Sequence, residues 1–549
     1  MRVTIAALLF PLVACPAEDP EVAVSTTGGS DPESSSDAPE TTTDVADTSS
    51  TAAQPTTTGD PPSVMIPARG LHIDWVEANQ GVGVPIGQDG AWVGASERLA
   101  RLLKNRNTLV RAFWTVDADF VPREIEAHLI LEHGDGTTER LVQSKLIEGD
   151  AFIGDLDRVF YWGIEAEDVQ PGLEYAIELF EVDPAYADGA PDAPPYFPDV
   201  EGTPVLVGIE DSYQLIKVTV VPFNYDDGAS CVTEPDTSEE TMQLFEDMLF
   251  MMNPVDTVEY TLHESVDWNT PLESFGQLNS YLSDLRFDEG APPEMYYYGL
   301  VDVCSGGLAG AGGQAFGIPQ DPTMENAYQR VSSGLSLDAD WSAETFVHEV
   351  GHSQGRYHVF CNGEEGGPDP SYPNPGGDVG EWGFGVVDFD LRHPTVNKDY
   401  MTYCHPVWVG TWGWNKVQPT VEALSMWDPN NPNNGAPRPD DPYAGSLLVG
   451  TIGQLGAQDW ITVPGALDRA ALAAASHDVE IEVGFADGRR TRMPAVARML
   501  PDSSDRQIVI PLPDAFAIVT SLARIEDGHR VAIDRDAIRE RHTLRAVRQ

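Results

Sequence analysis

Three histidines within eleven residues constrain the fold of this chain more than any other feature. The segment reads HEVGHSQGRYH, residues 348–358, and it holds three of the twelve histidines. His348 and His352 are spaced i and i+4, so a helix places them one turn apart on one face, where their imidazoles can converge on one ion. Phe346 and Val350 share a second, apolar face that suits packing on a sheet. We therefore expect a sheet-packed helix that carries a metal site.

The glycines of this segment support the same interpretation. Gly351 and Gly355 occupy positions where a helix prefers other residues. A third ligand at His358 would lie too far along a continued helix, and a glycine at 355 can adopt the left-handed conformation that turns the chain back. We expect the helix to begin at Asp340 or Ser342, the two candidate N-caps.

Glu349 lies between the first two histidines, where it can take a proton from a metal-bound water rather than act as a ligand. Three histidine ligands, His348, His352 and His358, leave a fourth position open, which is typical of a catalytic zinc site. The alternative is a solvated helix end with chance histidines. A complete HExxHxxGxxH pattern arises by chance in only about one in ten thousand chains, so we favour the metal site.

The residues His348, Glu349, His352, Gly355 and His358 match the zinc signature of the metzincin metalloproteases, and the chain resembles that family. The resemblance implies an α+β catalytic domain, one catalytic Zn²⁺ and hydrolysis of peptide bonds.

The family also has a Met-turn beneath the metal, and DYMTYC offers Met401 for it. Tyr403 matches the tyrosine that astacins and serralysins use as a displaceable ligand and transition-state stabiliser. The alternative role for both residues is ordinary core packing. The region from Tyr297 to Phe316 resembles the strand on which metzincins lay an extended peptide, and the chain as a whole looks most similar to bacterial secreted metzincins of the mucin-degrading type.

Five cysteines are present, and four remain if Cys15 is set aside. Four cysteines allow three pairings, of which we favour Cys231 with Cys304 and Cys361 with Cys404. Cys361 lies three residues after the third histidine and Cys404 three after Met401, so their bridge would hold the Met-turn beneath the metal. No CxxC pair occurs, which argues against a zinc cluster built from cysteines.

The N-terminus reads MRVTIAALLFPLVAC, with a positive start, a short apolar run and Leu-Val-Ala-Cys at its end. This pattern resembles a bacterial lipoprotein signal peptide, residues 1–14, followed by lipidation of Cys15. An unmodified secretory peptide is the alternative. We expect an exported protein, anchored by lipid to the bacterial cell envelope or surface, in an oxidising compartment.

Composition and periodicity divide the rest of the chain. Residues 15–66 are rich in Ser, Thr, Pro, Asp and Glu and predict a disordered acidic tether. Residues 67–210 contain alternating strands such as REIEAHLILE and predict a β-sandwich-like domain, in which His128 and His133 are expected at the surface. Residues 211–435 alternate strands and helices and hold the histidines. Residues 440–549 alternate again and predict a C-terminal β domain, so the fold class is a multidomain chain with a metzincin-like α+β domain between two β-sandwich-like domains.

The chain carries 32 Lys and Arg against 88 Asp and Glu, a formal net charge of -56. Such a surface repels phosphate backbones, so nucleic acid is excluded as a partner. A solubility adaptation, for instance to salty surroundings, explains the excess better than a dedicated cationic partner. Some of the acidic residues could bind Ca²⁺, but the sequence contains no DxDxDG-type loop that would locate such a site.

The predicted function is that of a zinc-dependent endopeptidase acting on extracellular proteins or glycoproteins by Glu-assisted attack of zinc-bound water. The alternative is a surface-anchored lipoprotein that binds glycans or proteins and carries a non-proteolytic zinc domain. A third hypothesis is a latent enzyme that needs processing, although the chain has no pro-segment cysteine to block the metal.

Overall fold

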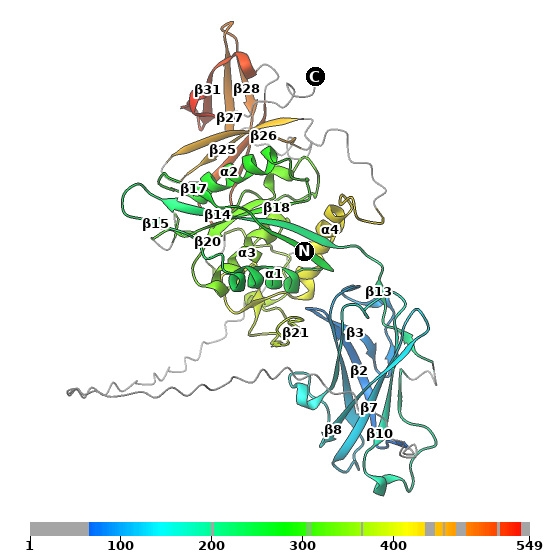
Figure 1. The fold of residues 1–549 in the computed structure, drawn as a ribbon. Coiled ribbons are helices and arrows are strands. Elements are labelled where there is room, and N and C mark those ends of the chain that lie inside the picture. The colour runs from blue at the N-terminus through cyan, green and yellow to red at the C-terminus, as the bar shows by residue number, and fades with distance from the viewer. Residues whose placement is uncertain are drawn as a thin grey trace, which may run out of the picture. The chain divides into compact units, whose positions relative to one another are not determined.

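The computed structural model describes residues 65–198, 203–304, 307–308, 310–363, 366–433, 445–453, 456–467, 479–512 and 516–539. The predicted signal peptide, Cys15 and almost all of the predicted tether lie outside these residues. The described chain is multidomain and sheet-rich (Figure 1). No helix in this part of the chain is both long and apolar enough to cross a membrane.

Two antiparallel sheets form the N-terminal β region. One has the order β1-β10-β7-β8, with β11 and β12 paired to β10, and the other has the order β4-β3-β2-β6-β9. Their inner faces share one apolar core, as a β-sandwich requires. The strands are β1 (Ile66–Pro67), β2 (Leu71–Asn79), β3 (Gly83–Gln88), β4 (Ala91–Trp92), β6 (Thr108–Val116), β7 (Arg123–Glu132), β8 (Thr138–Ile147), β9 (Phe160–Ile164), β10 (Glu174–Glu181), β11 (Tyr196–Phe197) and β12 (Val205–Leu206).

Strand β7 confirms the predicted alternation of buried residues, but it contradicts the prediction that His128 lies at the surface. Its predicted inward positions 125, 127, 129 and 131 are all fully buried. His128, predicted at the surface, is only 5% exposed. Its ring packs against Phe180, and its two nitrogens contact Arg140 and Glu126 at 2.7 and 2.6 Å. The neighbouring strands β8 and β10 supply Arg140 and Phe180, and strand periodicity alone cannot reveal such partners.

A seven-stranded sheet forms the centre of the next region, with the order β15-β14-β18-β20-β19 and with β16 and β17 also paired to β14. Strands β14, β16, β17, β18 and β20 run parallel, whereas β19 pairs with β20 in the antiparallel sense at the edge. The strands are β14 (Leu215–Asp226), β15 (Val232–Thr233), β16 (Thr257–Leu262), β17 (Val266–Trp268), β18 (Tyr296–Val301), β19 (Gly313–Ala315) and β20 (Val331–Leu335). Tyr297 therefore lies on an interior strand, and only the end of the predicted Tyr297–Phe316 segment forms the edge.

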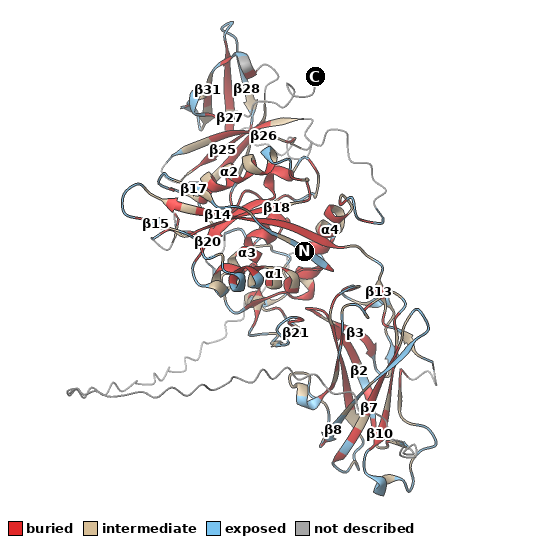
Figure 2. Cartoon of the chain, viewed as in Figure 1, coloured by how far each residue is buried: buried red, intermediate tan, exposed pale blue. Residues whose placement is uncertain are grey.

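Helices cover both faces of this sheet, which is why β14 and β18 are buried along most of their length (Figure 2). Helices α1 (Glu239–Met252) and α3 (Ala339–Ser353) pack on one face, and α2 (Phe275–Asp288) packs on the other. Residues of β18 alternate between the two cores: Tyr296 and Tyr298 face α1 and α3, and Tyr297 faces α2. Helix α4 (Thr411–Ser425) also packs in the first core.

Short two-residue strands complete this part of the chain. They are β5 (Leu102–Leu103) with β13 (Ile209–Glu210), β21 (Gly383–Phe384) with β22 (Leu391–Arg392), and β23 (Lys398–Asp399) with β24 (Val407–Trp408). The last pair closes the loop that contains Met401.

The C-terminal β region has two four-stranded antiparallel sheets, β26-β25-β30-β29 and β28-β27-β31-β32. The strands are β25 (Ser446–Ile452), β26 (Gln458–Pro464), β27 (Val479–Phe485), β28 (Arg490–Pro494), β29 (Val496–Met499), β30 (Arg506–Pro511), β31 (Val519–Glu526) and β32 (His529–Ile533). The first sheet is buried on both faces. Leu448 and Ile510 face the second sheet, whereas Val449 and Val509 join the core around α2.

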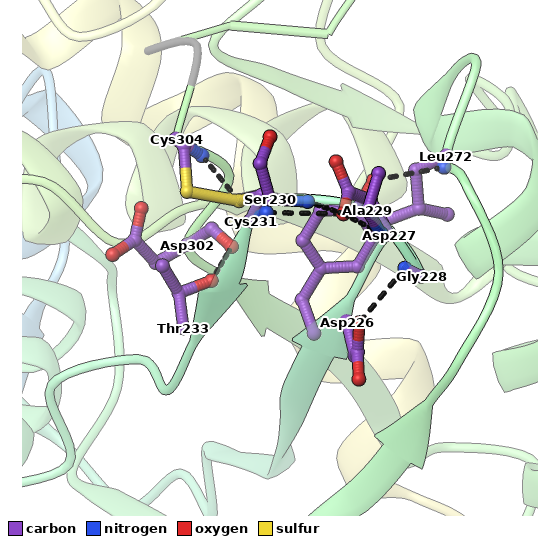
Figure 3. Close-up of a disulfide and its surroundings, with 11 residues drawn as sticks. Asp226, Asp227, Gly228, Ala229, Ser230, Cys231, Thr233, Leu272, Asp302 and Cys304 are labelled. Atoms are coloured by element: carbon purple, nitrogen blue, oxygen red, sulfur yellow. Dashed lines mark hydrogen bonds between the residues drawn. A yellow bond between two sulfur atoms is a disulfide. The ribbon is translucent and has the colours of Figure 1, made fainter.

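Both favoured disulfides are present, Cys231–Cys304 and Cys361–Cys404. Figure 3 shows the first, which joins the loop after β14 to the end of β18. In that loop the Asp227 carboxylate accepts backbone hydrogen bonds from residues 229, 230 and 231 at 2.7 to 3.0 Å. The bridge thus ties a self-capped turn to the central sheet.

Candidate metal centre

Helix α3 positions the first two histidines and begins slightly earlier than the sequence predicted. Its N-cap is Asp338, whose carboxylate accepts a hydrogen bond from Trp341 N at 3.1 Å, rather than Asp340 or Ser342. Phe346 and Val350 are fully buried in the core beneath the sheet. This packing fixes the rotation of the helix, so the other face presents the histidines to the cleft.

Helix α3 ends in a Schellman motif built on Gly355. Gly355 has a φ of 97°. Its N–H donates to His352 O at 2.9 Å, and the Arg356 N–H donates to Gly351 O at 3.0 Å. A β-carbon at 355 would lie 2.6 Å from Pro319 O, so both the backbone angle and the space require glycine. The chain reverses here as the sequence predicted, and His358 returns to the other two histidines.

Each of the three imidazoles is oriented by a backbone carbonyl. The Nδ1 atom of His348 lies 2.8 Å from Tyr400 O, that of His352 lies 2.7 Å from Arg356 O, and that of His358 lies 2.7 Å from Gly366 O. A carbonyl only accepts hydrogen bonds, so each Nδ1 must carry the proton. The neutral rings then direct three Nε2 lone pairs toward one another.

Such an arrangement of lone pairs fits a bound cation. The Nε2 atoms of His352 and His358 lie 3.1 Å apart, and His348 Nε2 is buried without a hydrogen-bond partner among the described residues. Burial lowers the pKa of His352 to about 4, which keeps that ring neutral and able to act as a ligand. Hydrogen bonds from Nδ1 to carbonyls are also the usual support of metal-binding histidines. The three predicted ligands are therefore brought together in a form that suits a metal.

A fourth group, which the sequence analysis did not identify, completes the cluster. Asp502 lies in the loop between β29 and β30, and its side chain is only 8% exposed. Its Oδ1 lies 3.0 Å from His358 Nε2 and 3.4 Å from His348 Nε2, and its Oδ2 lies 3.0 Å from His352 Nε2. Together the four residues form a group that could hold a metal ion.

The separations match a four-coordinate site. Zinc bonds of about 2.0–2.2 Å to nitrogen and oxygen imply ligand atoms roughly 3.3 Å apart at the corners of a tetrahedron. The measured separations between the Nε2 atoms and the Asp502 oxygens run from 3.0 to 3.4 Å. Burial by itself raises the pKa of the Asp502 carboxyl, but the surrounding imidazoles of His352 and His348 hold it well below its usual range. The carboxylate is thus available as an anionic ligand.

Glu349 is buried beside the histidines, at 1% exposure, and lines the same cavity. A β-carbon at Gly313 of strand β19 would lie 2.6 Å from Glu349 Oε1, so that glycine makes room for the carboxylate. Burial raises the pKa of Glu349 well above its usual value, and the negative charge of Asp502 raises it further. A carboxyl group with a raised pKa next to a metal position can accept and return a proton.

Met401 lies beneath α3 and explains the second glycine. Its side chain is fully buried, and a β-carbon at Gly351 would lie 2.6 Å from Met401 Sδ and 2.8 Å from the ring of Tyr400. Met401 O accepts a hydrogen bond from Val359 N at 2.9 Å. The loop and the helix therefore approach too closely for any side chain at 351.

Tyr403 reaches the cluster from the same loop. Its hydroxyl lies 3.3 Å from His358 Nε2 and donates to Asp502 Oδ1 at 2.6 Å. The Tyr403 ring lies 5.1 Å from the His358 ring, measured between centroids. The structure thus places the hydroxyl in contact with two members of the candidate metal cluster, His358 and Asp502.

A cavity of about 970 Å³ opens over these residues. Its walls include the end of strand β19, helix α3, the Met401 loop and residues 499–504 of the C-terminal region. This volume is large enough for several residues of a peptide. The sequence offered no signal for the last of these walls, because PDSSD reads as a surface turn between two strands.

Comparisons with known proteins place the chain in no family. No family model matches the sequence, and no curated protein matches it. A solved structure that matches is a calcium binding mutant of Bacteroides uniformis beta-glucuronidase 2, with 9% identity and a TM-score of 0.15. That alignment spans 42% of this chain and 29% of the other.

Proposed function

We propose that this chain is a zinc-dependent endopeptidase with a metzincin-like catalytic domain, which hydrolyses peptide bonds of extracellular proteins or glycoproteins. The convergence of three Nε2 lone pairs, from His348, His352 and His358, beside the buried Glu349 carries the proposal. Three histidine nitrogens suit zinc, and a neighbouring carboxylate that is not one of them suits general base catalysis.

The surroundings of α3 support the same assignment. Strand β19 is an antiparallel edge strand beside that helix, and an extended peptide can add to such an edge by main-chain hydrogen bonds. The loop at Met401 packs against Gly351, as a Met-turn beneath the metal would. Glycoproteins as substrates, as in the mucin-degrading metzincins that the sequence resembles, belong to the proposal.

The chain's own residues divide the reaction between them. His348, His352 and His358 would hold zinc, which when bound lowers the pKa of water and polarises a carbonyl group. Glu349 takes the proton of the attacking water and delivers it to the leaving amine. Tyr403 donates a hydrogen bond to the oxyanion that develops on the substrate. No acyl-enzyme is needed, because water attacks directly.

The substitution Glu349→Ala tests this assignment. Because Asp502 lies at the fourth position, the comparison uses full chains that carry Asp502→Gly, with and without Glu349→Ala. We expect the second chain to retain zinc, measured by metal analysis, and to lose peptide cleavage by a factor of at least about 10²–10⁴. Asp340→Ala is the matched control, since Asp340 is exposed in the first turn of the same helix. Undiminished cleavage after Glu349→Ala would refute the mechanism.

One observation favours a second function. Asp502 completes a set of four protein ligands, and closed four-ligand sites are typical of structural zinc. In that case the chain would be a surface-anchored protein that binds glycans or other proteins and uses the metal for stability. The two functions differ in the role of Asp502. It would stay bound to a structural metal, whereas the peptidase would need the position that it occupies.

Export and attachment through lipid at Cys15 are part of the proposal and rest on the sequence pattern alone. Incorporation of a radiolabelled fatty acid into the chain, abolished by Cys15→Ala, tests them. A Ca²⁺ site also stays a prediction without a position.

A further inference from the structure

We propose that the loop of residues 500–505 is an intramolecular inhibitor, in which Asp502 takes the coordination position that the reaction needs and keeps the chain latent until the loop is cut or the C-terminal region is removed. The inference rests on the proposed function, because it concerns the regulation of the same site. Four independent features of the loop support it.

The first feature is the position of the carboxylate. Asp502 contacts all three histidine Nε2 atoms within 3.4 Å, so no water or substrate carbonyl fits between them. The two carboxylate oxygens resemble the carboxylate of a cleaved peptide product. Tyr403, whose hydroxyl is placed for an oxyanion, donates instead to Asp502 Oδ1. Asp502 thus occupies the histidine Nε2 atoms and the Tyr403 hydroxyl, the groups that a substrate would need to contact.

The second feature is the contact between the loop and the edge strand. The Gln314 side chain on β19 donates a hydrogen bond to Ser503 Oγ. Just beyond the loop, Gln507 Nε2 donates to Phe316 O at 2.8 Å, and both groups are buried. Residues 499–504 therefore lie beside the strand on which a substrate peptide would bind.

The third feature is the backbone of Asp502, which has a φ of 59°. A residue other than glycine is strained in this left-handed region, although Asp adopts it more readily than most residues. Glycine would remove this strain but would also remove the carboxylate. The surrounding contacts hold Asp502 in this conformation and aim its side chain at the histidines.

The fourth feature is the way the C-terminal region is held. Its first sheet buries Leu447, Val449 and Val509 in the core formed with α2. A β-carbon at Gly276, in the first turn of α2, would lie 2.8 Å from the Thr451 side chain on β25. Such close packing holds Asp502 at the metal position for as long as the C-terminal region stays attached and uncut. A tethered ligand of this kind competes at an effective concentration in the millimolar range or above, which explains inhibition without high intrinsic affinity.

Acetohydroxamate binding to the Co²⁺-substituted full chain tests the inference without relying on catalysis. In the parent chain, Asp502 competes with the hydroxamate for the ion. We expect the visible spectrum of the Asp502→Gly chain to respond to at least about tenfold lower acetohydroxamate than the parent spectrum does. The same variant should cleave a peptide library at least about tenfold faster. Asp502→Asn, which keeps the shape and the tolerance for positive φ, serves if the glycine variant folds poorly.

Asp527→Gly is the matched control. Asp527 also has a positive φ, of 48°, and lies exposed in the turn between β31 and β32. The Asp527→Gly chain should bind acetohydroxamate and cleave the peptide library as the parent chain does.

The outcomes separate the two proposals. Equal hydroxamate binding by the parent and the Asp502 variants would overturn the inhibitor, whether or not either cleaves peptides. Loss of Co²⁺ from both Asp502 variants would also overturn it, because Asp502 would then be a permanent ligand. Tight hydroxamate binding by the variants without any cleavage would support the blocked position but refute the peptidase assignment.

Discussion

At the scale of the residue, the orientation of the imidazole rings decides what the site can bind. His348, His352 and His358 each donate Nδ1–H to a backbone carbonyl, so their Nε2 atoms are left as acceptors. Two of these carbonyls belong to residues 356 and 400, which follow Gly355 and precede Met401. Gly355 and the Met401 loop therefore act on the candidate site through the carbonyls that orient its histidines.

Gly351→Ala should destabilise the protein by about 1–3 kcal/mol, although alanine favours helices, because its β-carbon would meet Met401 Sδ at 2.6 Å. The same substitution in a Met401→Ala chain should cost less, because only the close approach to the Tyr400 ring, at 2.8 Å, then remains. Urea unfolding of the four chains of this double-mutant cycle measures the coupling. Equal losses of stability in both backgrounds would show that Met401 does not set the requirement for glycine.

At the scale of the element, the segment that follows helix α3 is joined to the Met401 loop by three kinds of bond. Backbone atoms of Val359 and Met401 are hydrogen-bonded, the buried Arg356 and Asp399 form an ion pair at 2.8 Å, and Cys361 is bridged to Cys404. The bridge spans 43 residues of sequence. The loop that follows the third histidine is thereby fixed to the Met401 loop.

Replacement of both Cys361 and Cys404 by Ser should lower the free energy of unfolding by about 2–5 kcal/mol in the chain-entropy model. It should also weaken zinc binding, because the two loops that position His358 and Tyr403 are released. Replacement of Cys231 and Cys304 by Ser is the control: similar stability is lost, but zinc affinity, measured by competition with a chelator, is retained. Equal zinc affinity in both double variants would contradict a role for the first bridge at the site.

At the scale of the whole molecule, two properties act on the site from a distance. The C-terminal region shares a core with α2 and supplies Asp502. The chain also carries a formal net charge of -56, so repulsion among its negative side chains destabilises the folded state. Salt screens such repulsion, with a Debye length of about 10 Å at 0.1 M and about 3 Å at 1 M.

We therefore expect the melting temperature to rise steadily between 0.05 and 1 M NaCl, by about 2–4 °C if screening contributes about 1 kcal/mol to a cooperative unit of roughly 150–250 residues. Chloride is used because it stabilises proteins less by exclusion than sulfate does. A sucrose series at low salt controls for general effects of cosolutes. A melting temperature that is constant or falls with NaCl would show that the charges are dispersed enough to be harmless.

Local signals predicted much of the fold and of the site. Alternating apolar positions located β7, and alternating strands and helices located the central sheet, because these patterns reflect which face each element buries. The prediction was wrong where partners come from other elements. His128 is buried by neighbouring strands, and Tyr297 lies on an interior strand. The N-cap of α3 was a separate, local error: it is Asp338, two residues before the predicted Asp340.

The sequence by itself determined the chemistry of the candidate centre, because His348, His352, Gly355 and His358 lie within one helical turn and a reversal, where local geometry is dictated by spacing. Only the tertiary structure decided what faces that centre. Asp502 is 144 residues from His358 along the chain, and it reaches the histidines because one sheet packs on α2. Such a contact depends on how two apolar faces dock, and no periodicity or motif in the sequence encodes that.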